Sequence, residues 1–321
     1  MENNKLLKIV NNFENLNIAV IGDIMLDKYI WGKVDRVSPE APVPVVSIKR
    51  TEYRVGGAGN VSTNLSSLKC RSIIMSITGS DQYSIILKDH LNKLNVDSLF
   101  EEDETRCTTV KSRIVAQKQQ LIRMDQEITQ TISKNITNKL LSKMDSYLDK
   151  LDALIISDYD KGLLSEAFIN KIIKKYQSIP IIVDPKVRDY NRYKGATIIK
   201  PNYKEFCEAN NKDQISFDKF DQFAEQIINR FNFAGLIVTL GKNGVYYFRR
   251  GESEIIPTEA HEVYDVSGAG DTFTAAFTAS FVITNDLAIS ARIGNLAAAV
   301  AVEKVGTATV TKQELIKKIA A

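Results

Sequence analysis

Histidine and cysteine are scarce in this sequence, and their scarcity excludes several kinds of site. The 321 residues include two histidines, which rules out a multi-histidine metal centre and leaves a histidine-dependent nucleophile triad two candidate bases. The three cysteines are odd in number and lack CxxC spacing, which argues against a disulfide framework and a zinc site. This cysteine usage fits a reducing compartment, and we expect a cytoplasmic protein.

Long apolar runs and an excess of one charge are lacking as well. No apolar run approaches the ~18 residues of a membrane-spanning helix, and the N-terminal segment has neither the apolar core nor the cleavage site of a secretion signal. Lys and Arg total 42 against 39 Asp and Glu, for a net charge of +3. This balance argues against a dedicated nucleic-acid binder, so we expect neither a membrane nor a nucleic acid as a partner.

Short apolar runs alternate with amphipathic stretches along most of the chain. Most runs are rich in β-branched residues and lack polar alternation, as strands of a parallel sheet covered on both faces do. We predict strands at 18–21, 73–77, 153–157, 181–183, 196–199, 236–239 and 245–248. We predict helices near 60–69, 82–94, 132–149, 165–176, 203–210, 217–230, 270–284, 287–303 and 312–320. This order predicts an α/β fold with a doubly wound, mostly parallel sheet flanked by helices, in one domain spanning residues 1–321.

Two segments depart from this alternation. Residues 26–50 contain three prolines within six residues, which forbid a helix and suit an edge strand or an extended ribbon. Residues 105–125 alternate like a hairpin with one polar face. Together they predict a small discontinuous β layer, which is either a pair of surface hairpins or a lid over the carboxyl edge of the sheet, where α/β folds place ligands.

The strongest chemical signal is the glycine-rich segment 265–271, which runs into an apolar helix. Free amides at Gly268, Ala269 and Gly270, together with the helix dipole, predict an anion site. Asp271 then lies in the first helical turn, where the dipole should keep it ionised. It can accept a proton from a substrate hydroxyl while the amides hold a migrating phosphoryl group. The alternative is a glycine loop with an Asp at a favourable helix position.

Other polar or glycine-rich positions follow the first predicted strand and open the next helix. Asp23 and Asp27 suit hydrogen bonds to neighbouring sugar hydroxyls, or they are turn aspartates. Gly57 and Asn60 allow close approach of a ligand to the backbone and offer it a donor and an acceptor. The alternative for this pair is a glycine turn with an Asn helix cap.

Asn202 and Glu205 lie three residues apart at a helix start. They either order a network of Mg²⁺, phosphate and water or form a capping box, and the spacing fits both. Gly241 and Gly244 join two strands as a glycine turn or as a nucleotide-phosphate loop. A P-loop motif and a dinucleotide fingerprint are absent from the sequence, which argues against an NAD-dependent dehydrogenase.

The segments DVSGAGDTFTAAF, VGGAGN, PNYKE and VTLGKNG, in their positions, resemble the ribokinase/PfkB family of carbohydrate kinases over essentially the whole chain. GDIMLDKYIWG, SPEAPVPVV, QQLIRMD, SDYDKG and VDPK resemble one subgroup, the D-glycero-β-D-manno-heptose 7-phosphate kinases. These occur alone or as the N-terminal half of a bifunctional enzyme with an adenylyltransferase. The resemblance implies a ribokinase-like fold and phosphorylation of the anomeric hydroxyl by ATP and Mg²⁺, giving the 1,7-bisphosphate for ADP-heptose and lipopolysaccharide-core synthesis. Alternatives are another PfkB-type kinase (for ribose, a fructose phosphate or a nucleoside) and a non-catalytic sugar-phosphate sensor.

The resemblance also implies roles for individual residues. Asp271 matches the catalytic base, and Gly268, Ala269 and Gly270 match the anion hole. Sugar-binding positions match Asp23, Asp27, Gly57 and Asn60. Positions linked to Mg²⁺, phosphate or nucleotide match Asn202, Glu205, Thr239, Gly241, Gly244, Gly306 and Thr307. The backbone near Asp265 and Ser267 matches the place of a monovalent cation, which suggests K⁺.

The 7-phosphate of such a substrate needs a cationic cradle. Candidates lie in the expected lid and at strand ends: Lys111, Arg113, Gln119, Arg123, Lys161 and Lys186. For Lys111 and Arg113 the alternative is a solvated hairpin face, because exposed basic residues are common. Lids of this family often pair between subunits, and an exposed sheet edge gives a reason to pair, so we expect a homodimer. We expect an adenylyltransferase partner to be either separate or fused.

Overall fold

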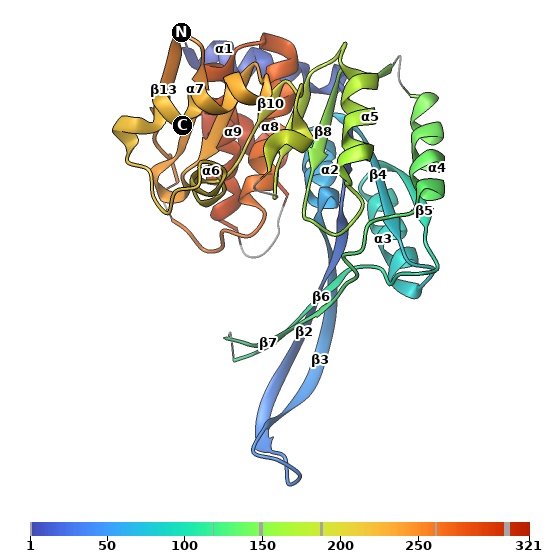
Figure 1. Cartoon of the computed structure of the whole chain (residues 1–321). Coiled ribbons are helices and arrows are strands. Elements are labelled where there is room, and N and C mark those ends of the chain that lie inside the picture. The colour runs from blue at the N-terminus through green and yellow to red at the C-terminus, as the bar shows by residue number, and fades with distance from the viewer. Residues whose placement is uncertain (1, 118, 148–149, 187–188, 261, 305–308) are drawn as a thin grey trace.

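The computed structural model describes residues 2–117, 119–147, 150–186, 189–260, 262–304 and 309–321. Within these residues a nine-stranded sheet carries helices on both faces, and a four-stranded sheet projects from one end of it (Figure 1). The predicted α/β fold, doubly wound and mostly parallel, is confirmed. In the part of the chain described, no helix combines the length and the apolar character needed to cross a membrane.

The nine-stranded sheet runs in the order β13-β12-β11-β10-β9-β8-β1-β4-β5. Its strands are β1 (Asn17–Gly22), β4 (Arg71–Thr78), β5 (Val96–Glu102), β8 (Ala153–Ser157), β9 (Ile181–Asp184), β10 (Ile198–Ile199), β11 (Gly235–Thr239), β12 (Val245–Arg249) and β13 (Glu252–Ile256). The pairings from β5 to β11 are parallel, and β12 and β13 add an antiparallel hairpin at one edge. All seven strands expected in this sheet are present.

Alternate residues of each central strand face opposite layers of helices. In β1, Ile18 and Val20 pack in one core, and Ala19 and Ile21 pack in the other. The first core is covered by α1 (Glu2–Asn11), α2 (Ala58–Ser67), α3 (Gln82–Lys93), α8 (Ala269–Thr284), α9 (Leu287–Val302) and α10 (Lys312–Ala320). The second is covered by α4 (Lys134–Asp145), α5 (Glu166–Tyr176), α6 (Tyr203–Ala209) and α7 (Phe220–Phe231). Short 3-10 helices lie at Asn12–Asn15, Tyr190–Tyr193, Phe217–Lys219 and Gly241–Asn243.

Three elements were not predicted. The first is α1, although Leu6, Ile9 and Val10 recur at helical spacing and are buried. The other two, β5 and β13, are the edge strands of the main sheet. An edge strand has one neighbour and carries charged residues, so it lacks the continuous apolar run that marked the central strands. In addition, the strand predicted at 196–199 is reduced to the two residues of β10.

The segments 26–50 and 105–125 do come together in a separate sheet, which we call the projecting sheet. It consists of β2 (Ile24–Val37), β3 (Pro44–Gly57), β6 (Val110–Ala116) and β7 (Gln119–Gln126), in the order β3-β2-β6-β7. β2 starts directly after β1 and β3 runs into α2, so the sheet is rooted at the carboxyl edge of the main sheet. Its far end extends away from the body (Figure 1). Its role as a lid and the division of the chain into domains stay predictions.

Candidate active site

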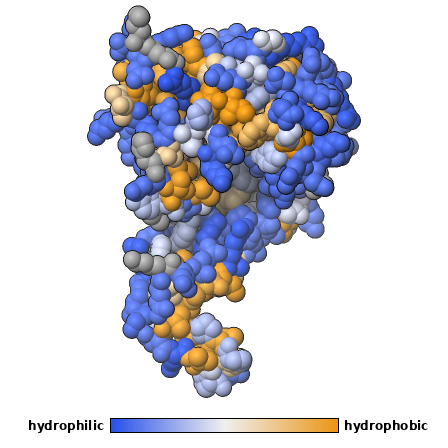
Figure 2. Space-filling model, turned by 90° about the vertical axis from the view of Figure 1, so that its left-hand side faces the viewer, coloured by the Kyte–Doolittle hydropathy of each residue, from blue (hydrophilic) through white to orange (hydrophobic). Residues whose placement is uncertain are grey.

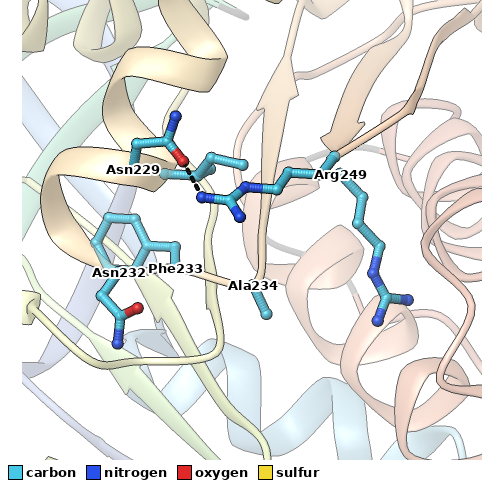
Figure 3. A pocket seen from close by; sticks show the side chains of 7 residues that line it. Asn229, Asn232, Phe233, Ala234 and Arg249 are labelled. Atoms are coloured by element: carbon cyan, nitrogen blue, oxygen red, sulfur yellow. Dashed lines mark hydrogen bonds between the residues drawn. The ribbon is translucent and has the colours of Figure 1, made fainter.

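A polar cleft of about 220 Å³ opens where β8, β9, β10 and β11 end and α8 begins. Seven of the residues proposed from the sequence line it: Lys186, Asn202, Glu205, Thr239, Gly268, Gly270 and Asp271. Residues from five separate stretches of chain therefore meet at the carboxyl edge of the sheet, as the fold class predicts. A second hollow, between α7 and β12, is lined by Asn229, Asn232 and Arg249 among others (Figure 3) and contains none of the proposed site residues.

Asp271 is buried at the start of α8, and both of its carboxylate oxygens accept hydrogen bonds. The Asn60 amide donates to Oδ2 and the Tyr159 hydroxyl donates to Oδ1, each at 2.7 Å. The pKa of Asp271 is raised from an ordinary 3.8 to about 6. Burial is the main cause and Asp184 adds to the rise, while the two hydrogen bonds and Lys200 oppose it. Burial thus outweighs the helix dipole, and Asp271 becomes an ionised base only above about pH 6.

A buried ion pair lies beside Asp271 on the floor of the cleft. Lys200, at the end of β10, places Nζ 3.0 Å from a carboxylate oxygen of Asp184, at the end of β9. The Thr274 hydroxyl, one turn into α8, donates to the other oxygen of Asp184. Lys200 is 3% exposed, so solvent screens its interaction with Asp184 only weakly.

The start of α8 has the form of an anion site. Gly268 caps the helix in the left-handed conformation, with φ of 80°, and no described side chain caps the helix. Nothing among the described residues lies within 4 Å of the place where a Cβ would stand on Gly270. The amide of Ala269 donates to Val266 O at 3.3 Å, so it is partly engaged within its own turn. The open first turn can take a phosphoryl group at its amides.

Asn202 and Glu205 form the capping box of α6. The Asn202 side chain accepts from the Glu205 amide, and the Glu205 side chain accepts from the Asn202 amide, each at 2.9 Å. The second carboxylate oxygen of Glu205 is 3.4 Å from Lys186 Nζ. The capping interpretation is therefore correct. It leaves one carboxylate oxygen of Glu205 facing the cleft region, where Mg²⁺ bound to phosphate oxygens needs only one or two protein carboxylates.

The described residues contain no cluster of three or more His, Cys, Asp or Glu side chains suited to hold a metal ion by themselves. This donor set fits a Mg²⁺ ion that arrives with phosphates. The contact of Glu205 with such an ion stays a prediction. Asp265 and Ser267 form a local turn in which the Ser267 amide donates to the Asp265 carboxylate at 2.8 Å. The K⁺ position near them stays a prediction.

Asp23 lies outside the cleft and organises a loop. Its carboxylate accepts from the backbone amides of Tyr159, Lys161 and Leu163, at 3.0 to 3.4 Å. Burial raises the pKa of Asp23 to about 6, Asp158 adds to the rise, and the three amides oppose it. Asp23 therefore holds the loop after β8 against the end of β1, whether or not it also meets a sugar.

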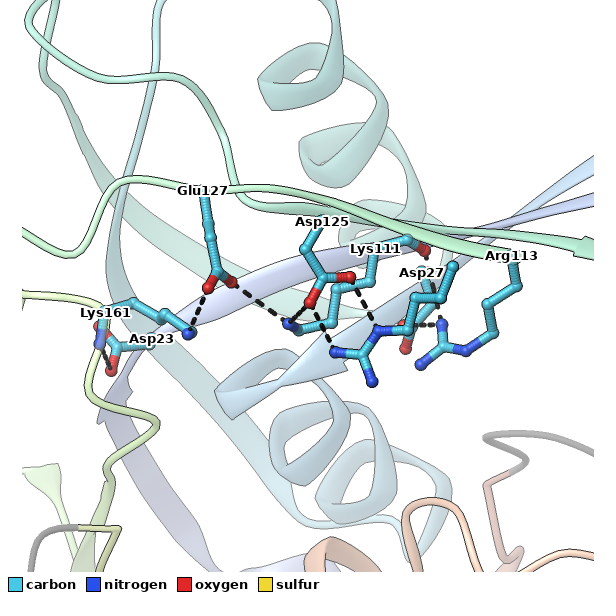
Figure 4. A network of polar contacts seen from close by, with 8 residues as sticks. Asp23, Asp27, Lys111, Arg113, Asp125, Glu127 and Lys161 are labelled. Carbon is cyan, nitrogen blue, oxygen red and sulfur yellow. Dashed lines mark hydrogen bonds and ion pairs between the residues drawn. The ribbon is translucent and has the colours of Figure 1, made fainter.

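Four of the basic side chains proposed as a phosphate cradle, Lys111, Arg113, Arg123 and Lys161, lie at the root of the projecting sheet, and each has acidic partners (Figure 4). The fifth, Lys186, lies in the polar cleft instead. Arg113 pairs with Asp27, Arg123 pairs with Asp125, and Lys111 Nζ lies 3.0 Å from Asp125. Glu127 lies between Lys111 and Lys161, at 3.2 and 2.7 Å. We call these seven side chains the charge network. Gln119 lies at the opposite end of the β6–β7 hairpin, paired with Ala116, and is not part of it.

Three other glycine positions have local structural reasons. Gly57 caps α2 with φ of 60°, and a Cβ there would stand 2.4 Å from Asp23 O. Gly244 has φ of 93°, and a Cβ there would meet Ile256 O at 2.0 Å, so glycine is required for this turn. Gly241 has φ of 58° with open space around it, as a ligand-facing turn would need. Gly306 and Thr307 lie outside the described residues.

Sequence reasoning missed four polar residues of the cleft, namely Asp158, Tyr159, Asp184 and Lys200. Each ends a strand of the parallel sheet or lies within two residues after one. The carboxyl ends of such strands meet at one edge, so their first polar residues were available as a signal. Three of them stood within the segments SDYDKG and VDPK, for which only Lys161 and Lys186 were considered.

The family model described as pfkB family carbohydrate kinase matches residues 15–314 of the chain. The chain belongs to this family. It is 38% identical over 305 residues to "Bifunctional protein HldE" of Geobacter sulfurreducens, covering 94% of this chain and 62% of that protein. It is 38% identical over 315 residues to the protein of the same name in Koribacter versatilis, covering 98% of this chain and 65% of that protein. The pfkB kinase chain thus spans less than two thirds of the length of these relatives.

Solved structures support the same fold at low sequence identity. Phosphofructokinase-2 from Escherichia coli in complex with potassium superposes with a TM-score of 0.81 at 17% identity, covering 95% of this chain and 98% of that one. Arabidopsis thaliana ribokinase complexed with ribose and ATP gives 0.73 at 17% identity, covering 95% of this chain and 99% of that one. The chain therefore has the ribokinase-like fold, in agreement with its membership of the pfkB family of carbohydrate kinases.

Proposed function

We propose that this kinase transfers the γ-phosphoryl group of ATP to the anomeric hydroxyl of D-glycero-β-D-manno-heptose 7-phosphate, giving the 1,7-bisphosphate for ADP-heptose synthesis. The observation that carries the transfer step is the buried Asp271 beside the open first turn of α8. The substrate is supported by the segments that resemble heptose kinases. It is also supported by the similarity of nearly the whole of this chain to part of the proteins named bifunctional HldE. The cytoplasmic location and an adenylyltransferase partner, fused or separate, belong to the same proposal.

Asp271 is the base in this proposal. One of its oxygens takes the proton of the anomeric hydroxyl as that oxygen bonds to the γ-phosphorus, and the bond from phosphorus to the β,γ-bridging oxygen breaks to release ADP. The amides of Gly268 and Gly270 face the three oxygens of the transferring group, and Lys200 adds a fixed positive charge nearby. Bound Mg²⁺ would neutralise charge on the ATP phosphates, with Glu205 as its protein contact. Positioning and charge stabilisation suffice, because phosphoryl transfer needs no covalent enzyme intermediate.

The sugar end of the substrate is proposed to lie between this cleft and the charge network. Asn60 lies between the cleft and the projecting sheet. Its side-chain amide donates a hydrogen bond to Asp271, and its helix, α2, begins where β3 of the projecting sheet ends. Arg113 and Lys161 are 19% exposed at their side chains, so they are accessible to a phosphate. An incoming phosphate would replace carboxylate partners on these cations.

We also propose a homodimer through the projecting sheet. Hydrophobic side chains gather on the part that extends from the body (Figure 2). They are Val37, Val43, Ile48, Leu121, Ile122 and Met124, each between 41% and 65% exposed. The outer strands β3 and β7 also leave sheet edges open. An exposed apolar sheet face with open edges is a surface that a second copy can cover.

The test of the transfer step is the variant Asp271→Asn, assayed by coupled ADP release with heptose 7-phosphate. Loss of a general base costs about 10²- to 10⁴-fold in rate, so we expect kcat to fall by that much while substrate binding is retained. The matched control is Asp213→Asn, which changes an exposed carboxylate in the loop after α6 and should keep full activity. Near-normal turnover by Asp271→Asn would show that Asp271 is not the base.

The substrate is tested with a panel measured in the same assay. We expect turnover with heptose 7-phosphate to exceed that with fructose 6-phosphate, ribose and adenosine. Turnover on one of these three with none on the heptose phosphate would refute the substrate while leaving the kinase chemistry intact. ATP binding without ADP release on any acceptor would instead favour a sugar-phosphate sensor.

A further inference from the structure

Tyr159 reaches the catalytic carboxylate from a loop to which sequence reasoning assigned no such role. The residue follows β8, and its hydroxyl donates to Asp271 Oδ1 at 2.7 Å across a sequence separation of 112 residues. Burial and the neighbouring Asp271 keep the pKa of Tyr159 well above its ordinary value of 10, so the hydroxyl stays protonated and donates. The hydrogen bond is thus directional, from the phenol to the carboxylate.

The main chain of Tyr159 is itself fixed in place. Its amide donates to Asp23 Oδ2 at 3.0 Å, and the amides of Lys161 and Leu163 donate to the same carboxylate. The Lys161 ammonium then pairs with Glu127 at the root of the projecting sheet. A short loop therefore connects the catalytic carboxylate, the end of β1 and the projecting sheet.

We propose that Tyr159 is a positioning residue for Asp271. Its hydroxyl fixes the rotation of the carboxylate, so that the remaining lone pairs face the acceptor hydroxyl, and it favours the ionised form. Tyr159 acts through Asp271 and transfers no proton itself. The inference rests on the proposed kinase function and names a residue that this function requires.

Four groups face Asp271 from the elements packed around it. Asn60 on α2 and Tyr159 after β8 donate hydrogen bonds, Lys200 after β10 contributes positive charge, and Asp184 at the end of β9 contributes negative charge. Burial and Asp184 favour the neutral acid, while the other three favour the carboxylate. Removing the phenol hydroxyl takes away one of the groups that counter burial and Asp184, so the neutral acid form of Asp271 becomes more favoured.

The experiment compares Tyr159→Phe with the matched variant Tyr246→Phe. Tyr246 also donates from a buried ring to an aspartate, Asp221 on α7, at 2.8 Å, and neither residue lines the cleft. The first measurement is the pH profile of kcat/KM, whose acid limb we expect near pH 6 in the wild type. For Tyr159→Phe we expect this limb to move up by about one pH unit, because a hydrogen bond to a charged group is worth roughly that much.

A second measurement does not depend on the substrate. In protein labelled with ¹³Cγ aspartate, the Asp271 carboxyl carbon is assigned by its absence from Asp271→Asn, and its titration is followed by NMR. We expect its midpoint to rise in Tyr159→Phe and to stay unchanged in Tyr246→Phe. An unchanged Asp271 titration in folded Tyr159→Phe would refute the positioning role. Wild-type protein with a normal Asp271 titration and no sugar kinase activity would instead refute the proposed function.

Discussion

Replacing Asp271 with asparagine should stabilise the protein at neutral pH while it lowers kcat by about 10²- to 10⁴-fold. The carboxyl is 7% exposed, and its pKa in the folded chain is about 6 against an ordinary 3.8. A carboxyl with a raised pKa weakens the fold as pH rises above its ordinary value, because the unfolded chain releases the proton first. The penalty starts near pH 4, grows until about pH 6 and is constant above that.

The two pKa values give the size of this penalty. A difference of about two units corresponds to roughly 3 kcal/mol at pH 7.5 and roughly 1 kcal/mol at pH 4.5. Asparagine carries no charge at either pH. Its amide can also accept from Asn60 and donate to the Tyr159 oxygen, so both contacts of residue 271 are retained. The free energy of unfolding should therefore rise by up to about 3 kcal/mol at pH 7.5.

Urea unfolding of wild type and Asp271→Asn at pH 7.5 and pH 4.5 tests this reasoning. The stabilisation should be at least twice as large at the higher pH. The control Asp213→Asn changes an exposed carboxylate and should stay within about 0.5 kcal/mol of wild type at both pH values. If Asp271→Asn is no more stable than wild type at pH 7.5, or gains equally at both pH values, the pKa of Asp271 is not raised in the folded protein.

Two further predictions concern the start of α8 and the projecting sheet. Gly270→Ala should fold normally and gain up to about 1 kcal/mol, because alanine is the better helix former. Its methyl group would enter the open space of the cleft, so the rate of ADP release should fall at least about tenfold. If the variant is folded, as its melting curve shows, and keeps full activity, the anion-site assignment is wrong. Ile122→Asp, on the projecting sheet, should shift sedimentation toward the monomer, whereas Ile85→Asp, at a more exposed position on α3, should not. A wild type that sediments as a monomer would refute the dimer.

The parts of the fold that could be predicted are those whose signal is local. The run 153–157 is fully buried, and its bounds were predicted to the residue because a strand covered on both faces is apolar throughout. The edge strands β5 and β13 escaped prediction because their outer side faces solvent, so their residues need not be apolar. The path of β2 and β3 away from the body was not predictable, because it depends on pairing between β2 and β6, which lie far apart in sequence.

The candidate site divides in the same way. Asp271 and the glycines before it were identified because a glycine-rich turn followed by an apolar helix is a pattern in one stretch of sequence. The partners of Asp271 were not, because Asn60 and Tyr159 reach it from 211 and 112 residues away. The pKa of Asp271 was also judged from its own helix alone, whereas burial by other elements sets it.

For the proposed function, the charge network gives a physical reason why a kinase of near-neutral charge would select a phosphorylated sugar. The chain has no general positive field to attract anions, since 42 basic residues face 39 acidic ones. At the root of the projecting sheet, cations are already paired: Arg113 with Asp27, and Lys161 with Glu127. A neutral sugar cannot replace a carboxylate in such a pair, and a cation left alone would carry a desolvation cost. A phosphate dianion can replace it and brings more charge than the carboxylate it displaces. In the proposed function, selection of a sugar phosphate therefore follows from an exchange of partners on Arg113 and Lys161, from carboxylate to phosphate, where the projecting sheet joins the body.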